Sequence, residues 1–539
     1  MNAYAENGPA PASALHPDTE VAIIGGGFSG LGAAIKLHEA GFDEHVILER
    51  GPTVGGTWRD NTYPGCACDV ESHLYSFSFA QKADWSRRFA QQPEILAYLE
   101  DVTRKFDLQR RLRLNTFVTK AVWDEAAGLW RIRTCSAQRM NEYMQAKGLH
   151  NWSEIDYQAG DLPSDGGLSA RFLISGMGPL SRAAYPNIPG LHDFGGQMFH
   201  SGHWDHSVEL KNKRVAVIGT GSSAAQFVPA IAPEVAQLDV YQRTPNWIWP
   251  RNDRSISPRM QKLYAQLPLL RELERTKLYL ANEARALGLA VDPRLMKLGE
   301  ILARHHLRKQ IKDPELRRKF TPNYRLGCKR IVVSDDWYPA FLRDNVALIT
   351  TGIREVTATG VVTSDGVEHP ADVIILGTGY AVQAVIPPGM VIGRDGRDLH
   401  DWWHDGPRAY LGTAAYGLPN FFLMLGPNSG LGHNSMIYMI ESQLMHVIGC
   451  LKQLKARKLQ RVEVLPEVER KFADWVQTRG SDTVFQSGCR SWYLDDRGRN
   501  VAIWPSFSFD FRRRVRDFDA ADYTLAAAAA PERIETSSN

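Results

Sequence analysis

The sequence predicts an α/β fold with two Rossmann-like dinucleotide-binding domains and a helical insertion in the second of them. Three observations support this fold class. A β-rich run, a glycine-rich turn and an Ala- and Leu-rich helix occur twice, within residues 19–50 and 213–244. Residues 256–318 carry a helical period rich in Leu, Ala, Arg and Glu. The chain of 539 residues is also too long for one ordinary hydrophobic core.

The first repeat begins with a strand expected at 21–24, and the pattern Gly25-x-Gly27-x-x-Gly30 follows it. Gly25 permits the tight turn, Gly27 lets a pyrophosphate approach the backbone, and Gly30 lets helix and strand pack closely. The phosphates are expected at the positive end of the helix. Glu49 lies 24 positions after Gly25, close to the spacing of an acid that binds ribose hydroxyls. The first repeat therefore predicts a dinucleotide without a 2′-phosphate.

The second repeat has Gly219-x-Gly221 with an alanine at the third position, and Arg243 stands where the first repeat has Glu49. A carboxylate repels a 2′-phosphate, whereas a guanidinium binds it with two parallel hydrogen bonds. Thr244 supplies a further donor. This interpretation predicts NADP(H) in the second site, and a solvated charge at a strand end is the alternative for Arg243.

Two unlike dinucleotide sites in one chain predict two cofactors in contact. FAD in the first site and NADPH in the second is the natural pair, because hydride transfer needs a flavin that faces a nicotinamide. FAD and NADPH are therefore the expected cofactors.

The segments between the repeats complete the two domains. Strands are expected at 128–134 and 170–181 in the first domain and at 368–380 in the second. A polar insertion at 136–168, with one helix, is expected to be a surface loop of unassigned role. The expected order is a flexible tail at 1–18, the first part of the FAD domain at 19–178, the NADP domain at 179–385 with its helical insertion at about 256–320, the second part of the FAD domain at 386–525, and a flexible tail at 526–539.

Composition narrows the class of partner. Apolar residues make up 44% and charged residues 23%, as in soluble globular proteins. The net charge of +3 gives no indication of nucleic acid or an anionic membrane as a partner. No run of about 18 apolar residues indicates a spanning helix, and the first residues lack the features of a secretory signal. A cytoplasmic chain, monomeric or weakly homo-oligomeric, is expected.

The six cysteines predict neither a metal site nor a redox-active pair. Cys66 and Cys68 form a C-x-C without a second pair at zinc spacing, so small buried thiols are the expected reading. A reduced, cytoplasmic chain without a metal is expected.

Two motifs give the chain a specific resemblance. The stretch FGGQMFHSGHWD, which shows no clear helical or strand period, fits F-x-G-x-x-x-H-x-x-x-W-P/D, and GGTWRDNTYPGCACD fits G-G-x-W-x-x-x-x-F/Y-P-G-x-x-x-D. With two dinucleotide turns around them, residues 20–520 resemble a type I Baeyer–Villiger monooxygenase, a class B flavoprotein monooxygenase. The fingerprint positions are Phe194, Gly196, His200, Trp204 and Asp205. The resemblance implies that this stretch links the domains like a hinge, so a structural role for His200 outweighs acid–base catalysis.

The resemblance also implies an active-site arginine after a lysine, which Lys329 and Arg330 supply. On their own these two residues would be a solvated basic pair. Asp69 is implied to orient Arg330, Lys329 to join Arg243 at the 2′-phosphate, and Trp492 to lie in a mobile loop that closes over NADP. The full set of expected cofactor contacts is Gly25, Gly27, Gly30, Glu49, Gly56, Thr57, Trp58, Asp69, Tyr75, Gly219, Gly221, Ser222, Ser223, Arg243, Thr244, Lys329 and Trp492.

The function that follows is an NADPH- and O₂-dependent conversion of a ketone to an ester or lactone. The resemblance implies a C4a-peroxyflavin as the oxidant, and sulfoxidation as a possible second activity. The permanent charge of Arg330 would stabilise anionic oxygen. One alternative is an N- or S-oxygenating flavin-containing monooxygenase, and a second is an NADPH-dependent flavin reductase, which usually carries a C-x-x-C absent here. The ketone and its selectivity cannot be read from the sequence.

Overall fold

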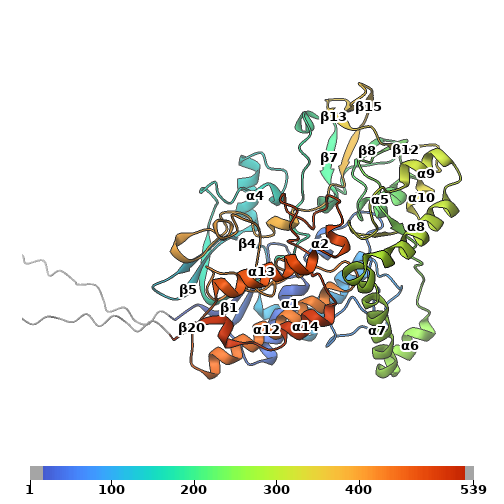
Figure 1. The fold of residues 1–539 in the computed structure, drawn as a ribbon. Helices are drawn as coiled ribbons and strands as arrows, with labels where there is room; N and C mark the ends of the chain where they lie inside the picture. Colours follow the sequence, from blue (N-terminus) through green and yellow to red (C-terminus); the bar gives the residue numbers. More distant parts are fainter. Residues whose placement is uncertain (1–15, 528–539) are drawn as a thin grey trace, which may run out of the picture.

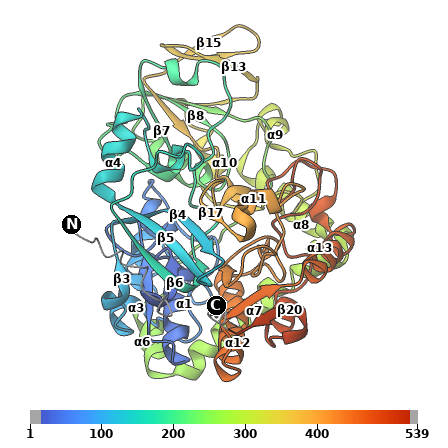
Figure 2. The same ribbon diagram turned by 90° about the vertical axis from the view of Figure 1, so that its left-hand side faces the viewer.

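The computed structural model describes residues 16–527. The tails expected at 1–18 and 526–539 lie mostly outside these residues. Figures 1 and 2 show two lobes, with the first large sheet in the lower lobe and the second in the upper lobe. The α/β class and the two dinucleotide-binding units are thereby confirmed.

The first sheet has eight strands in the order β17-β4-β5-β6-β1-β2-β3, with β18 pairing β6 beyond the end of β5. β1, β2 and β6 run parallel, and their buried Val, Ile and Leu side chains contact helices on the sheet faces. The strands are β1 Thr19–Ile24, β2 His45–Leu48, β3 Leu112–Arg113, β4 Thr116–Asp124, β5 Leu129–Ser136, β6 Gly166–Ser175, β17 Val391–Ile392 and β18 Phe421–Leu423. β5 and β6 confirm the strands expected at 128–134 and 170–181. β17 and β18 come from the C-terminal half of the chain and complete the same sheet.

Helices cover the first sheet. They also pack the C-terminal part of this domain against its N-terminal part. The glycine-rich helix α1 packs against α12, which in turn packs against α14. A small antiparallel pair of strands, β19 and β20, lies beside them. The helices are α1 Phe28–Glu39, α2 Thr57–Asp60, α3 Gln92–Lys105, α4 Ala137–Ala146, α11 Leu399–Trp402, α12 Met436–Ala456, α13 Pro466–Gly480 and α14 Ser508–Val515, and the two paired strands are β19 Arg461–Val464 and β20 Tyr523–Ala526.

The second sheet is a parallel five-stranded Rossmann-like sheet in the order β12-β9-β8-β16-β7. A three-stranded antiparallel extension projects from its end at the top of Figure 2. The strands are β7 Gln197–His200, β8 Arg214–Ile218, β9 Gln237–Tyr241, β12 Val346–Ile349 and β16 Val373–Leu376, the extension is β13 Ile353–Val356, β14 Gly360–Thr363 and β15 Glu368–Pro370, and the flanking helices are α5 Ala224–Ile231 and α10 Trp337–Ala340.

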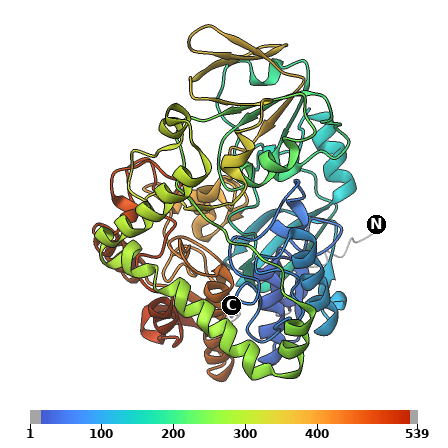
Figure 3. The ribbon, with the colours of Figure 1, turned by 90° about the vertical axis from the view of Figure 1, so that its right-hand side faces the viewer.

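The helical insertion expected at about 256–320 is present, but half of it lies on the other lobe. In Figure 3 its yellow-green helices descend from the upper lobe to the lower one. The buried Arg275 donates to His73 O at 2.8 Å, and Asn282 donates to Glu71 at 2.9 Å. The insertion thus joins the lobes. Its elements are β10 Ile248–Trp249, α6 Pro258–Gln266, α7 Pro268–Glu283, the π-helical turn η5 Leu287–Val291, η6 Pro293–Leu295, α8 Met296–Gln310, α9 Pro314–Phe320 and β11 Val332–Val333.

The fingerprint stretch differs from expectation. The sequence shows no clear strand period there, yet β7 pairs with β16 as the edge strand of the second sheet. The alternation is missing because the strand has only four residues, and its last two, Phe199 and His200, are both buried although they point to opposite faces of the sheet. The connection between the lobes is therefore anchored by backbone hydrogen bonds rather than free along its length.

Candidate functional site

The first glycine turn lies between β1 and α1, at the carboxyl end of the parallel strands. Gly25 has φ +100°, and a Cβ there would lie 2.7 Å from Gly176 O. A Cβ at Gly30 would lie 1.8 Å from Gly25 O, so only glycine permits this contact between turn and helix. At Gly27 the nearest atom to a Cβ would be Gly56 Cα, at 3.7 Å. The turn thus leaves open the side that faces a cleft, as a bound pyrophosphate requires.

That cleft brings together most of the residues expected to bind the flavin dinucleotide. Gly27 and Glu49 line it from the first repeat, Thr57 and Trp58 line it from the second motif, and Tyr75 lines it from just beyond that motif. Trp58 Nε1 donates to the Tyr75 hydroxyl at 3.2 Å. Gly56, also on the wall, has φ +51°, a left-handed conformation that favours glycine.

Glu49 is buried, at 3% exposed, and is held on three sides. It accepts hydrogen bonds from Gly26 N at 2.6 Å and Gly51 N at 2.7 Å, and it pairs with Arg59 at 2.6 Å. Arg59 was not predicted from the sequence. It directly follows the motif tryptophan Trp58, and a cation there could be expected to neutralise a buried acid.

The insertion at 136–168 lies largely exposed at the surface and contains one helix, α4, as expected, but it also reaches the flavin cleft. Its Trp152 and Tyr157 line the cleft of the first glycine turn. The Arg50 guanidinium lies 3.5 Å from the Trp152 ring centroid, and Ser153 Oγ is 2.9 Å from His203 Nε2. Arg182 donates to Ser153 O at 2.9 Å. Tertiary packing brings the insertion to the cleft, and no sequence period indicated it.

The second glycine turn repeats this geometry between β8 and α5. Gly219 has φ +110°, and a Cβ there would lie 2.4 Å from Gly377 O. A Cβ at Gly221 would meet no atom within 4 Å. Arg243 is exposed beyond β9, with Thr244 half-buried beside it. Burial lowers the pKa of Lys329, and the positive charge of Arg243 lowers it further, so the two cations share one region as expected.

A central cleft joins the two turns. Trp58, Asp69 and Arg330 line it on one side, and Ser222 and Ser223 line it on the other. Tyr75 and Trp492 complete the wall. A flavin and a nicotinamide placed on their respective turns would therefore meet in this cleft, next to Arg330.

Arg330 and Asp69 form the charged pair of this cleft. Arg330 Nη2 donates to Asp69 Oδ2 at 2.5 Å. Burial tends to raise the pKa of Asp69, but the Arg330 guanidinium outweighs it and holds that pKa below its ordinary value. The Asp69 carboxylate in turn raises the pKa of Arg330. The Arg330 side chain stays 35% exposed, because it faces cavities rather than packed core. It is thus a permanent cation that a reacting group can reach.

A further cavity lies on the other side of this pair, under the helical insertion. Asp69 and Arg330 lie on its wall, and its other polar residues are Asn282, Arg285, His433 and Asn434. Its remaining wall is mostly apolar and is made by Trp249, Leu287, Leu289, Leu295, Met296, Leu298, Ile331 and Val333. The charged pair therefore separates the dinucleotide cleft from an apolar chamber.

The fingerprint residues lie outside the three cavities described above. His200 is 1% exposed, its Nδ1 accepts from Gly202 N at 3.0 Å, and burial lowers its pKa to about 4. Trp204 packs on Phe199 and Phe227, and Asp205 accepts from Ser207 Oγ at 2.6 Å. A Cβ at Gly196 would lie 2.7 Å from the Phe194 ring and 2.5 Å from Asp372 O. These contacts support packing roles for the fingerprint.

Two contacts that the sequence analysis missed join the lobes near the central cleft. The Gln226 side chain on α5 donates to Ala67 O at 3.0 Å and accepts from Ala67 N at 3.2 Å. The Tyr380 hydroxyl donates to Asn61. In each pair the two residues are more than 150 positions apart in the sequence, and no local motif contains both of them.

The cysteines follow the prediction in one place and depart from it in another. Cys66 and Cys68 are buried thiols as expected; burial raises the pKa of Cys66 to about 12 and that of Cys68 well above its ordinary value. Cys328 and Cys489, however, form a disulfide, so a chain with only reduced thiols was a wrong expectation. The fold brings these two together across 161 residues, which no spacing rule could reveal.

Within residues 16–527, no helix combines the length and apolar character needed to cross a bilayer.

Comparison with known proteins gives consistent matches over nearly the whole chain. Residues 169–386 match the flavin-binding monooxygenase-like family, and residues 23–92 match an NAD(P)-binding Rossmann-like domain. A Baeyer–Villiger monooxygenase of Pseudomonas aeruginosa is 49% identical over 96% of this chain and 93% of its own length. One of Streptomyces coelicolor is 42% identical over 96% of this chain and 94% of its own.

Comparison with solved structures gives matches of the same kind. OTEMO in complex with FAD and NADP superposes with a TM-score of 0.80 at 27% identity, covering 95% of this chain and 100% of that one. Cyclohexanone monooxygenase in its closed form gives 0.80 at 28% identity, with 95% and 99% covered. An oxidized steroid monooxygenase bound to NADP gives 0.78 at 30% identity, with 95% and 100% covered.

Proposed function

The chain belongs to the Baeyer–Villiger monooxygenases, and on this premise we propose which of its residues carry out the reaction. The enzyme contains FAD, uses NADPH and O₂, and converts a ketone to an ester or lactone. The relatives named as Baeyer–Villiger monooxygenases do not favour an N- or S-oxygenating enzyme or a flavin reductase. Sulfoxidation as a second activity, a cytoplasmic location and a monomeric or weakly associating chain stay predictions.

The two glycine turns hold the two cofactors. The first turn, with Glu49 at its ribose position and Trp58 and Tyr75 toward the central cleft, holds FAD. The second turn holds NADPH, with Arg243 and Lys329 at the 2′-phosphate and Trp492 on the cleft wall. FAD, when bound, accepts a hydride from NADPH and activates O₂. The glycine geometry supports this assignment, because each turn lacks a Cβ on the side that faces its cleft.

Arg330 carries the electrostatic part of the reaction, and its pairing with Asp69 is the observation on which this proposal rests. Oxygen atoms of the reacting ketone gain negative charge during the reaction, and a fixed cation stabilises that charge. A guanidinium cannot lose its proton under these conditions, so it does not quench a nucleophile by protonation. Asp69 positions the guanidinium between the central cleft and the apolar chamber.

We propose that the apolar chamber takes the hydrocarbon part of the ketone. Its wall of Leu, Met, Ile and Trp side chains offers burial to a non-polar chain or ring, whereas its polar end places the carbonyl next to Arg330. A ketone bound in this way would have its carbonyl oxygen near the guanidinium and its body away from water.

An Arg330→Ala variant tests the assignment. Anaerobic mixing with NADPH should reduce its flavin at a rate near that of the wild type, because Arg330 is not a phosphate contact. Exposure to O₂ with a panel of linear, cyclic and aromatic ketones should then give hydrogen peroxide without ester. Arg330→Lys, which keeps the charge but loses the forked donors, should retain a small activity. Ester formation by Arg330→Ala at the wild-type rate would refute the role given to Arg330.

A further inference from the structure

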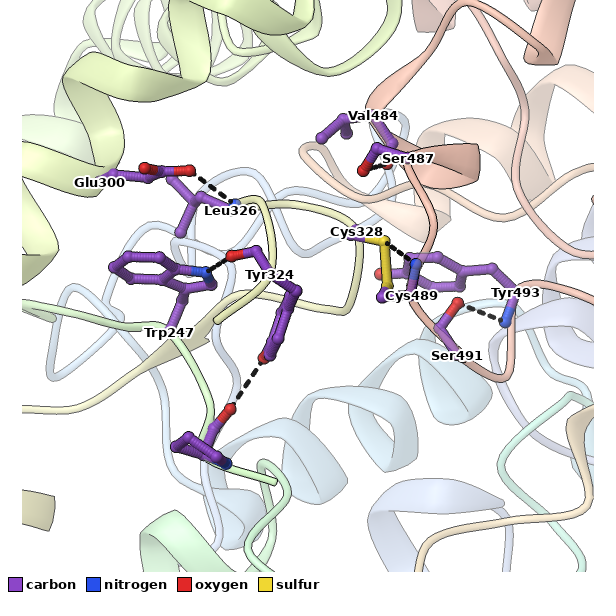
Figure 4. The surroundings of a disulfide bond; sticks show 11 residues. Trp247, Glu300, Tyr324, Leu326, Cys328, Val484, Ser487, Cys489, Ser491 and Tyr493 are labelled. Carbon is purple, nitrogen blue, oxygen red and sulfur yellow. Dashed lines mark hydrogen bonds between the residues drawn. A yellow bond between two sulfur atoms is a disulfide. The ribbon is translucent and has the colours of Figure 1, made fainter. Parts of the chain in front are cut away.

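The disulfide joins two segments that both reach the active site. Cys328 directly precedes Lys329 and Arg330, and Cys489 lies three residues before Trp492. The two Cα atoms are 6.1 Å apart, and Cys489 N donates to Cys328 Sγ at 3.2 Å. Figure 4 shows the bond between the loop that contains Leu326 and Cys328 and the C-terminal segment that runs from Val484 to Tyr493.

The C-terminal segment, residues 484–494, packs on the second lobe through one cluster of side chains. Val484, Phe485 and Tyr493 are buried against Trp247 and Leu326. Tyr493 also lies close enough to Arg330 for that cation to lower its pKa, although burial raises the pKa of Tyr493 overall, to about 12. Holding this segment in place therefore fixes one wall of the central cleft and the surroundings of the catalytic arginine.

The two sulfur atoms differ in their access to solvent. Cys328 is 0% exposed, whereas Cys489 is partly exposed. The other four cysteines, Cys66, Cys68, Cys135 and Cys450, are buried free thiols. A small oxidant from solvent reaches Cys489 first, and Cys328 is the thiol next to it.

We propose that Cys328 and Cys489 are a reversible redox-modification site whose oxidant is hydrogen peroxide. The thiolate of Cys489 attacks peroxide and breaks its O–O bond, which gives a sulfenic acid and one water once the released hydroxide takes a proton. The Cys328 thiol then attacks the sulfenic sulfur, the S–S bond forms and a second water leaves. Two thiols lose two electrons and two protons in total, and peroxide is reduced to two waters.

The enzyme itself can supply the peroxide that oxidises Cys489, so its own turnover would regulate it. This step rests on the proposed function. When NADPH oxidation is not coupled to a ketone, the enzyme releases hydrogen peroxide from the central cleft, whose wall includes Trp492 of the same segment as Cys489. Disulfides in a reducing compartment are typically transient and redox-sensing, so thiol reductants of the cell would reopen the bond. Uncoupled turnover therefore closes the disulfide, and the disulfide in turn fixes the position of the cleft wall.

The disulfide should favour the closed cleft. Trp492 and Tyr493 lose conformational freedom when they settle against the cleft. This loss is smaller if the disulfide already holds the segment at Cys489 than if packing alone holds it. Reduction is expected to raise the KM for NADPH and the share of NADPH that yields peroxide, each by about threefold to tenfold. Oxidation should restore both values.

The test compares the FAD-loaded full-length enzyme in two redox states. Alkylation under denaturing conditions followed by mass spectrometry should find four free thiols after peroxide treatment and six after dithiothreitol, with Cys328 and Cys489 as the protected pair. The KM for NADPH and the peroxide-to-ester ratio are then measured in both states. Cys489→Ser should behave like the reduced wild type in either state, and Cys450→Ala, a buried thiol outside the pair, should keep the wild-type response.

Two results would overturn the proposal: six free thiols after peroxide treatment, or an unchanged KM and coupling ratio when the wild-type bond is reduced. Failure of the proposed function is distinguishable, because an enzyme that forms no ester in either redox state would still reveal its thiol state by alkylation and its NADPH affinity by titration.

Discussion

The two dinucleotide turns share their backbone and differ in their surroundings. At the first turn, Glu49 is buried and paired with Arg59, and Trp152 of the insertion lines the cleft. At the second, Arg243 is exposed and the cleft wall includes Trp492, which is 41% exposed. Both turns require glycine at their first position, since Gly25 and Gly219 have positive φ. The backbone thus sets where a dinucleotide binds, and the side chains around it set how firmly.

This difference matches the two roles in catalysis. A flavin that stays bound through many cycles needs an enclosed site with buried polar partners, whereas NADPH must arrive and NADP must leave in every cycle. The covalent bond from Cys328 to the segment of Trp492 lies on the exchanging side, where Trp492 itself is exposed. Variants at five positions test this difference between the two sites.

The largest effect is expected from Gly30→Ala. Its Cβ would lie 1.8 Å from Gly25 O, a backbone atom that cannot move without opening the turn, so the protein should fail to retain FAD or to fold. Gly221→Ala is the matched change in the second turn, where a Cβ meets no atom within 4 Å. It should fold, keep its flavin and lose NADPH affinity. Flavin absorbance after gel filtration separates the two, and equal flavin loss in both variants would contradict the comparison.

Glu49→Gln should come next. It removes one of the two carboxylates that pair with the half-buried Arg59, and because Asp60 still pairs with Arg59 at 2.7 Å, the cost should stay below the about 3 kcal/mol of a buried charge left unpaired. The expected result is a lower urea midpoint and partial loss of FAD, with no change in NADPH specificity. Glu44→Gln, an exposed residue on the loop before the same strand, is the control. A variant that retains a full complement of FAD and wild-type stability would show that the charge of Glu49 does not stabilise the first site.

Arg243→Ala should act only on the exchanging site. Loss of a charged hydrogen bond to the 2′-phosphate is expected to raise the KM for NADPH by about 10- to 100-fold, which corresponds to about 1.4–2.7 kcal/mol, and to leave NADH kinetics unchanged. Flavin content and thermal stability should stay at wild-type values, because the side chain is exposed. Arg354→Ala, an exposed arginine on β13, is the control. Equal effects on NADPH and NADH would remove the 2′-phosphate assignment.

The smallest effect at neutral pH is expected from His200→Asn, in the strand that joins the lobes. The folded pKa of His200 is lowered from 6.5 to about 4 by burial, so the unfolded state binds more protons between these values. Stability is then lost as the pH falls from 6.5 toward 4, by about 2 kcal/mol at pH 5. Asparagine keeps an acceptor for Gly202 N and removes the titration. Urea unfolding at pH 5 and 7.5 measures the change, and an unaltered pH slope would exclude His200 as its source.

Much of the candidate site follows from short-range patterns. Glycine spacing and the acid or arginine 24 residues later predicted both turns, because each pattern reflects local backbone geometry or one chemical requirement. The Lys329–Arg330 pair was predicted only through the family resemblance, since on its own it would be a solvated basic pair. The sequence did not indicate Arg59 as the partner of Glu49, or Gln226 and Tyr380 as links between the lobes. Each of those contacts joins residues whose proximity depends on how separate elements pack.

Local patterns in the amino-acid sequence predicted the fold class, the places of the two dinucleotide turns and the cofactor expected at each, whereas the active-site pair was predicted through the family resemblance. Only the packed structure reveals that β7 joins the second sheet, that the insertion at 136–168 reaches the flavin cleft, and that Cys328 bonds to Cys489. The reason is physical. A turn or a strand is specified by neighbours along the chain, whereas a contact across 161 residues is specified only when the whole core has packed.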